Sequence, residues 1–114
     1  MEKLVLQNLK TADVKEAVRH PDETVRATAA QRVCRDIRSK ALSDAERDFA
    51  QKLLKHISED SADMVRRALA VTLKNSPKLP HDIAVKLAAD IESIAVPVLT
   101  HSPVFTDADL VEVL

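Results

Sequence analysis

Apolar residues recur every three or four positions along most of this chain, and that spacing predicts amphipathic helices. In residues 22–39, one side of the expected helix is apolar, and the opposite side carries arginines and other polar groups. The apolar positions there are Val25, Ala29, Ala30, Val33, Cys34 and Ile37. With start and stop signals added, helices are expected to begin near residues 11, 22, 43, 61, 80, 93 and 106. The sequence therefore predicts an all-α fold.

Residues that cap helices mark several of these starts. Ser43 and Glu46 form a capping box, in which each side chain satisfies a main-chain amide of the other residue. Pro80 is expected at a helix start, where its missing amide costs nothing. If Ser93 caps its helix, Pro97 falls at the edge of the first turn and removes one hydrogen bond or adds a mild kink. The other expected caps are Asp22, Ser61 and Thr106.

Blocks of residues recur along the chain. Val25-Arg26 with Ala30 is matched forty positions later by Val65-Arg66 with Ala70. A second block recurs after twenty-six positions and pairs Leu73, Ser76 and Pro77 with Leu99, Ser102 and Pro103. Self-similarity at such a period predicts stacked repeats. We expect one domain, with helix pairs over about 12–39, 43–75 and 80–101 and an incomplete unit at 106–114.

A helix, a turn with Pro and Asp, and then Val-Arg followed by Ala at helical spacing resembles a HEAT-type repeat. His20-Pro21-Asp22-Glu23-Thr24-Val25-Arg26 is the clearest instance, and the second has Asp63 and Val65-Arg66 without the Pro. Residues 61–114, with Asn-Ser-Pro-Lys-Leu-Pro and His-Ser-Pro-Val-Phe-Thr, resemble leucine-rich-repeat-variant units. Residues 12–114 are most similar to an uncharacterised bacterial family of HEAT-like proteins, a domain of unknown function.

This resemblance implies a right-handed α-solenoid of antiparallel helix pairs with about seven helices. In such stacks the Val-Arg helix is the second of each pair and lines the concave side. Arg26 and Arg66 are then expected to reach the Asp of a neighbouring turn, which forms a ladder between repeats; contact with a ligand is the alternative. Because 106–114 lacks a partner helix, we expect the chain to be the N-terminal part of a longer protein. The family has no assigned reaction.

Composition indicates what kind of core these helices share. Hydrophobic residues make up 46% of the chain and aromatic residues only 2%, so the core is expected to be aliphatic. The chain has no glycine, which removes the residue most used in tight hairpin turns and phosphate-binding loops.

Its single cysteine excludes an intramolecular disulfide and fits a reducing compartment. No apolar run is long enough for a signal peptide or a membrane span, so we expect a cytoplasmic protein.

The residues that most often carry catalysis or bind metals have simpler roles here. No two of the four histidines are three or four positions apart, so no helix offers a histidine pair for zinc. Cys34 reads as a small core residue. Asp107 and Asp109 look like a metal pair, but after Thr106 they more simply complement a helix dipole. The sequence predicts no catalytic residue, no cofactor and no metal.

A binding surface is the strongest functional hypothesis. If both Val-Arg helices face one groove, that groove has an apolar centre and basic edges formed by Arg35, Arg38, Met64, Arg67, Val71 and Lys74. Such a surface suits an acidic amphipathic helix or peptide. With 17 basic and 18 acidic residues, the chain lacks the positive excess of a dedicated nucleic-acid or membrane-surface binder. The prediction is a non-enzymatic protein-interaction module. The alternatives are a nucleic-acid-binding or DNA-repair-type HEAT-like protein, and a purely structural homo-oligomer.

The C-terminal third is more apolar than the end of a repeat stack should be, because end repeats normally present a polar face to water. Its apolar residues are Ile91, Ile94, Val96, Val98, Leu99, Val104, Phe105, Leu110, Val111, Val113 and Leu114. We expect further chain, or a second copy in a homo-oligomer, to cover this end.

Overall fold

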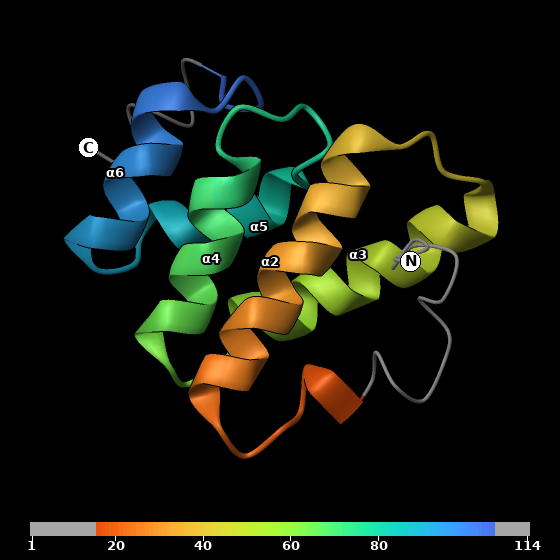
Figure 1. Ribbon diagram of the computed structural model, residues 1–114. Coiled ribbons are helices and arrows are strands. Elements are labelled where there is room, and N and C mark those ends of the chain that lie inside the picture. Colours follow the sequence, from red (N-terminus) through yellow and green to blue (C-terminus); the bar gives the residue numbers. More distant parts are fainter. Residues whose placement is uncertain (1–15, 107–114) are drawn as a thin grey trace.

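Five helices follow one another in the computed structural model, which describes residues 16–106 (Figure 1). They are α2 (Glu23–Ser39), α3 (Asp44–Ser58), α4 (Asp63–Leu73), α5 (His81–Ala88) and α6 (Glu92–His101). No strand occurs between residues 16 and 106, so the all-α prediction is confirmed for this range. The helix expected at 106–114 lies outside the described residues. Of the one expected from 11 to 19, only the end at 16–19 is described.

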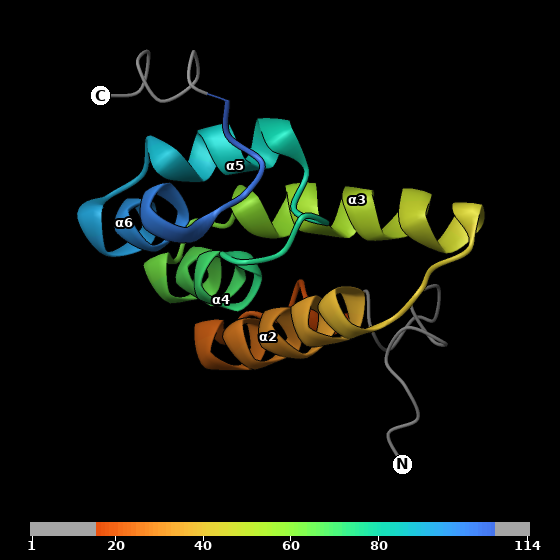
Figure 2. The same cartoon turned by 90° about the horizontal axis from the view of Figure 1, so that it is seen from above.

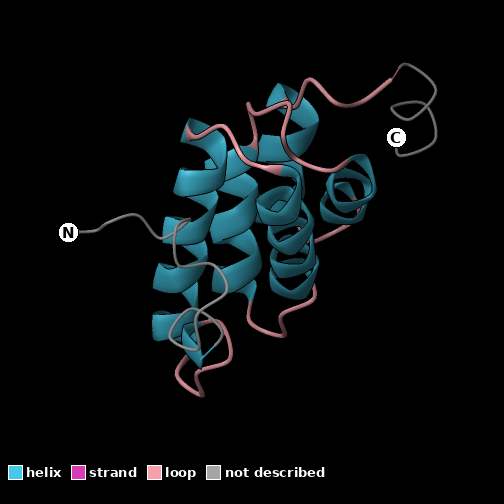
Figure 3. Cartoon of the chain, turned by 90° about the vertical axis from the view of Figure 1, so that its right-hand side faces the viewer, coloured by secondary structure: helices cyan, strands magenta, loops and turns pink. Residues whose placement is uncertain are grey.

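The five helices form two layers (Figure 2). One layer contains α2, α4 and α6, with α4 between the other two, and the second layer contains α3 and α5. Each second-layer helix packs on its successor in the chain, α3 against α4 and α5 against α6. The thinnest dimension is 19 Å, which fits two layers of helices whose axes lie roughly 8–10 Å apart. Figure 3 shows the same compact globule from the side.

An aliphatic core fills the space between the layers, as the composition predicts. Its largest fully buried side chains are Ile37, Leu54, Ile57, Leu69, Leu73, Leu79, Leu87 and Ile94. Burial of one such side chain stabilises the fold by about 1.5–3 kcal/mol. Ala30, Ala70 and Ala84 are also fully buried, and their small side chains let neighbouring helices approach closely. Phe49 and Phe105 are only half-buried and pack at the edge of this core.

Two of the predicted caps are confirmed. The Asp22 side chain accepts a hydrogen bond from the Thr24 amide at 2.8 Å at the start of α2. At the start of α3, the Ser43 hydroxyl accepts from the Glu46 amide at 3.2 Å, and the Glu46 carboxylate accepts from the Ser43 amide at 2.9 Å. These bonds satisfy amides that the first helical turn leaves without partners.

Two other expected helix starts, those at Ser61 and Ser93, differ from the structure, and the one at Pro80 is confirmed. Ala62, not Ser61, is the N-cap of α4, and the nearby Asp60 carboxylate accepts from the Ala62 amide at 2.9 Å. Pro80 is the N-cap of α5, immediately before its first residue. Helix α6 follows Ile91 as N-cap, so Ser93 is its second residue and Pro97 its sixth. Pro97 therefore lies inside the helix and offers no N–H to the Ser93 carbonyl.

The prediction that Val25 belongs to the core is wrong. Val25 is 38% exposed, whereas Val65 at the equivalent position of α4 is 1% exposed. Helix α4 has a neighbour on each side within its layer, and α2 packs on α4 at one side only among the described residues. The two valines thus have the same position on their helices, but only Val65, on the helix with a neighbour on each side, is buried.

Candidate functional site

Two arginines, one on α2 and one on α4, each join their own helix to a later turn of the chain by the same kind of contacts. Arg26 forms a bidentate contact with the Asp60 carboxylate, in which Nε donates to Oδ2 at 2.9 Å and Nη2 donates to Oδ1 at 3.0 Å. Its third nitrogen, Nη1, donates to the His20 carbonyl at 2.8 Å. Arg26 thus connects the turn before its own helix to the turn before α4. Two-armed contacts of this kind fix geometry as well as adding energy.

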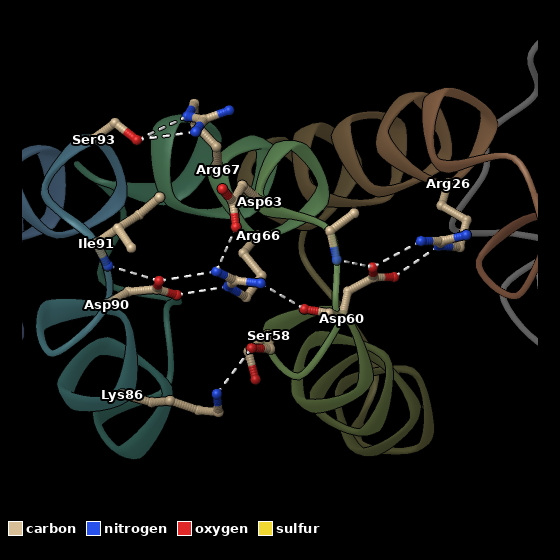
Figure 4. Close-up of polar contacts among 11 residues, drawn as sticks. Arg26, Ser58, Asp60, Asp63, Arg66, Arg67, Lys86, Asp90, Ile91 and Ser93 are labelled. Carbon is tan, nitrogen blue, oxygen red and sulfur yellow. Dashed lines mark hydrogen bonds and ion pairs between the residues drawn. The ribbon is translucent and has the colours of Figure 1, made fainter.

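Arg66 repeats this arrangement one helix pair further along (Figure 4). Its Nε donates to Asp90 Oδ2 at 2.7 Å and its Nη2 to Asp90 Oδ1 at 3.0 Å, while Nη1 donates to the Asp60 carbonyl at 2.8 Å. A further contact joins Nη2 to Asp63 at 2.9 Å. Arg26, Asp60, Arg66 and Asp90 form what we call the arginine ladder. The predicted pairing of each arginine with the Asp of a neighbouring turn is confirmed.

Burial strengthens the ladder. The side chains of Arg66 and Asp90 are 15% and 12% exposed, and that of Asp60 is 6% exposed. The hydrogen bond from Arg66 holds the pKa of Asp90 below its ordinary value, against the opposing effect of burial. Burial would raise the pKa of Asp60, but the Arg26 and Ala62 hydrogen bonds outweigh it and the pKa is lowered. The hydrogen bond to Asp60 raises the pKa of Arg26 in turn.

Three other cationic side chains donate hydrogen bonds to main-chain carbonyls in distant segments. No pattern in the sequence indicated these contacts. Lys86 Nζ on α5 donates to the Ser58 carbonyl at 3.0 Å, at the end of α3. Arg38 Nη1 on α2 donates to the Thr72 carbonyl of α4 at 3.1 Å. Lys78, between α4 and α5, donates to carbonyls at the end of α2. Cations at helix C-termini are stabilising because they face the negative end of the helix dipole.

These contacts also fix the direction of the first-layer helices. Arg26 near the start of α2 bonds to Asp60 just before α4, and Arg38 near the end of α2 bonds to Thr72 near the end of α4. Helices α2 and α4 therefore run side by side in the same direction. Arg66 and Arg67, near the start of α4, contact Asp90 and Ser93 at the start of α6. The exposed sides of α2, α4 and α6 thus lie next to one another.

All six residues predicted to bind a partner belong to this layer. Arg35 and Arg38 are exposed on α2, and Met64 and Val71 are exposed on α4. Arg67 is half-buried and donates from Nε and Nη2 to the Ser93 hydroxyl at 3.2 and 3.0 Å. Lys74, also half-buried, is the C-cap residue of α4. Five of the six predicted residues therefore lie within two adjacent parallel helices, and the sixth directly follows one of them.

Among residues 16–106, exposed large apolar side chains are confined to the same layer. Among residues 16–106, the large apolar side chains with the greatest exposure are Val25, Met64, Val71, Ile91 and Val96. They lie on α2, α4 and α6 or at the cap of α6. Helices α3 and α5 contribute none of them. Val96 on α6, which the sequence analysis placed only in the apolar C-terminal third, is thus a further exposed apolar residue of this layer.

The cations of α3 differ in their partners from those predicted to bind on α2 and α4. On α3, Arg47 pairs with Asp44, Lys52 with Asp48, and Lys55 with Glu59, the C-cap residue of the same helix. In the part of the chain that the structure describes, no ion pair joins an acidic residue to Arg35, Arg38, Arg67 or Lys74. Helices α2 and α4 therefore carry, beside exposed apolar side chains, four basic residues with no acidic partner among residues 16–106.

The chemistry of the lone thiol is set by its burial. Cys34 is fully buried in α2, as its place in the apolar pattern predicts. Loss of hydration raises the pKa of this thiol to about 12, and the nearby Arg38 charge opposes that effect. The thiol is therefore protonated at neutral pH, and it lacks the accessible, basic surroundings of a nucleophilic cysteine.

No group of three or more metal-binding side chains comes together within residues 16–106. The candidate pair Asp107 and Asp109 lies outside the described residues. The four histidines are all near helix ends, and His20 Nδ1 accepts a hydrogen bond from the Asp22 amide at 2.9 Å. Between residues 16 and 106, no helix combines the length and apolar character needed to cross a bilayer.

The chain matches no protein-family model, no curated protein and no solved structure. Its resemblance to HEAT-like repeats therefore stays a prediction, carried by the residues of its turns and helices.

Proposed function

We propose that this chain is a non-catalytic protein-interaction module that binds an acidic amphipathic helix or peptide. The binding surface is the α2–α4–α6 face, formed by Arg35, Arg38, Met64, Arg67, Val71, Lys74 and Val96. One observation carries the proposal: exposed large apolar side chains and cations without acidic partners occur together on this layer.

The chemistry of the face defines the partner. An amphipathic helix could place its apolar side over Met64, Val71 and Val96, in the way helices lie in grooves of other proteins. Methionine and arginine are both enriched in protein interfaces. Acidic residues on the flanks of that helix would meet Arg35 and Lys74, which would steer the encounter and fix its orientation.

The proposed architecture is a right-handed, HEAT-like α-solenoid, in which α2, α4 and α6 are the second helices of successive pairs. The two-layer arrangement and the repeated contacts of the arginine ladder support it. In that architecture the α2–α4–α6 face would be the concave side.

A direct test uses a labelled helical peptide of Leu, Ala and Glu, with the same peptide carrying Lys at every Glu position as its control. We expect saturable binding of the acidic peptide only, measured by fluorescence anisotropy. The double variant R35E/K74E should weaken that binding about tenfold, as roughly 1.4 kcal/mol of lost attraction would.

The matched control for this variant is K52E/K55E, which reverses two exposed cations on α3. It should bind as the unchanged chain does, with the same helicity by circular dichroism. Equal weakening by the two double variants, or equal binding of the two peptides, would contradict the proposal.

Self-association is a second candidate because Ile91 and Val96 leave apolar surface at the α6 end of the layer. Light scattering at several concentrations separates it from peptide binding, since a homo-oligomer gains mass without any peptide. A nucleic acid fits less well, because the chain has neither Trp nor Tyr for base stacking and a net charge of −1.

A further inference from the structure

A cleft of about 410 Å³ opens where the end of α2, the start of α3 and the connection from α4 to α5 meet. Its floor is apolar and consists of Ile37, Ala50 and Leu54, which are buried, with Leu42 half-buried beside them. Pro77 forms part of the wall. Neither the arginine ladder nor the α2–α4–α6 face contributes a residue to this cleft, so it is a separate site.

Among residues 16–106, the polar side chains that line the cleft are Arg47, Gln51 and Lys78, and no acidic residue of that range lines it. Arg47 donates to the Asp44 carboxylate at 3.0 Å and to the Leu42 carbonyl at 3.4 Å. These bonds use two of the five N–H donors of its guanidinium. Because Asp44 is fully exposed, this ion pair is weak and readily exchanges for another anion.

Lys78 contributes a fixed positive charge to the cleft. Its Nζ donates to the carbonyls of Ile37 at 3.0 Å and Arg38 at 3.3 Å, and also to that of Lys40. Those three bonds use all three N–H donors of the ammonium group. The charge therefore stays at the end of α2, where it offsets the negative end of the helix dipole.

We propose that this cleft binds a small aliphatic carboxylate. The hydrocarbon chain would lie on Ile37, Ala50 and Leu54, and the carboxylate would accept hydrogen bonds from the Arg47 guanidinium and the Gln51 amide. An apolar floor with a few convergent polar groups is typical of small-molecule sites, and the volume falls within their range of roughly 300–1,000 Å³. Arg47 and Lys78, with no acid among the described lining residues, give the site its preference for an anion.

The test is a titration of the full chain with octanoate, followed by two-dimensional amide NMR. Octylamine and octanol serve as probes with the same hydrocarbon chain but a positive or neutral head group. We expect octanoate to shift the amide signals of Leu42, Gln51 and Lys78 in a saturable way, with octylamine causing no such shift. Absence of saturation by octanoate, saturation confined to other residues, or equal binding of octylamine would overturn the proposal.

Two variants locate the carboxylate. Arg47→Ala should weaken octanoate binding about threefold or more, because it removes a charged hydrogen-bond donor from the rim. Gln51→Glu should weaken it further by placing a negative charge beside the bound anion. Lys52→Ala removes an exposed cation that does not line the cleft, so it is the matched control and should leave the affinity unchanged. Equal losses in Arg47→Ala and Lys52→Ala would contradict the assignment. Because the acidic peptide is expected elsewhere, either binding result can fail without the other.

Discussion

Arg66 and Asp60 lie six residues apart, and Arg66 Nη1 donates to the main-chain carbonyl of Asp60 at 2.8 Å. The carboxylate of the same Asp60 accepts hydrogen bonds from Nε and Nη2 of Arg26 on α2. Asp60 therefore links two arginines, one through its side chain and one through its main chain. This residue makes the arginine ladder continuous from α2 to the turn before α6.

Within residues 16–106 the ladder has two arginine–aspartate pairs, Arg26–Asp60 and Arg66–Asp90. The positions that would continue it at either end carry other residues. His20 stands forty positions before Asp60, and its Nδ1 accepts from the Asp22 amide at 2.9 Å, as Asp60 accepts from the Ala62 amide. At the other end, Ala95 is the fourth residue of α6, where α2 and α4 carry Arg26 and Arg66. The described part of α6 thus offers no arginine at the ladder position.

Acid should weaken the fold through Asp60 and Asp90. Both have a pKa lowered in the folded protein, so below the ordinary Asp value of 3.8 the unfolded state binds more protons. Their contribution is present above about pH 4 and is lost as the pH falls through the folded pKa values. Urea unfolding at several pH values should show this loss, and Asp90→Asn should make the acid slope shallower. A slope unchanged by this variant would contradict the contribution of Asp90.

Cys34 should react with a thiol reagent only when the protein unfolds. The thiol is fully buried, and its pKa of about 12 leaves almost no thiolate at pH 8. For a fold of ordinary stability, labelling of the native chain should be at least about 10³-fold slower than labelling in concentrated urea. Absorbance of the released reagent measures both rates. Similar rates in the two conditions would contradict the burial of this thiol.

Removing Lys78 should loosen the end of α2. Lys78→Met keeps an apolar stem but removes the ammonium group, which donates hydrogen bonds to three carbonyls. We expect it to destabilise the fold by about 0.5–2 kcal/mol. Amide hydrogen exchange should become faster at Ser39 and Lys40. The control is Lys55→Met, whose exposed partner Glu59 is the C-cap residue of α3, and its effect should stay within about 0.5 kcal/mol. Equal effects of the two variants would contradict the role of Lys78.

The sequence predicted the helices well because their apolar spacing and their caps are local features. Asp22 and the Ser43–Glu46 box act within one turn, so their residues alone identify them. Exposure of Val25 was missed because periodicity indicates which side of a helix is apolar, but not whether another helix covers it. The Ser61 cap was wrong because α4 begins one residue later than expected, with Ala62 as its N-cap, and the Asp60 carboxylate accepts from the Ala62 amide.

Long-range contacts were predicted only where a repeat carried them. The Val-Arg signature led to the expectation of an arginine ladder, although the Asp partners lie 34 and 24 residues away. Lys78 contacts carbonyls 38 to 41 residues earlier in the chain, and it belongs to no recurring block. The cleft beside it is built from three separate segments, so its shape depends on packing that no single stretch of sequence specifies.

The central claim is that the arginine ladder couples neighbouring helix pairs, and a double-mutant cycle of Arg66→Met and Asp90→Asn tests it most directly. Because both side chains are largely buried, each single change should destabilise the fold by about 1–3 kcal/mol in urea unfolding. The double variant should lose at least about 1 kcal/mol less than the sum of the two single losses. Losses that simply add, within about 0.3 kcal/mol, would show that the two residues act independently and would contradict the ladder.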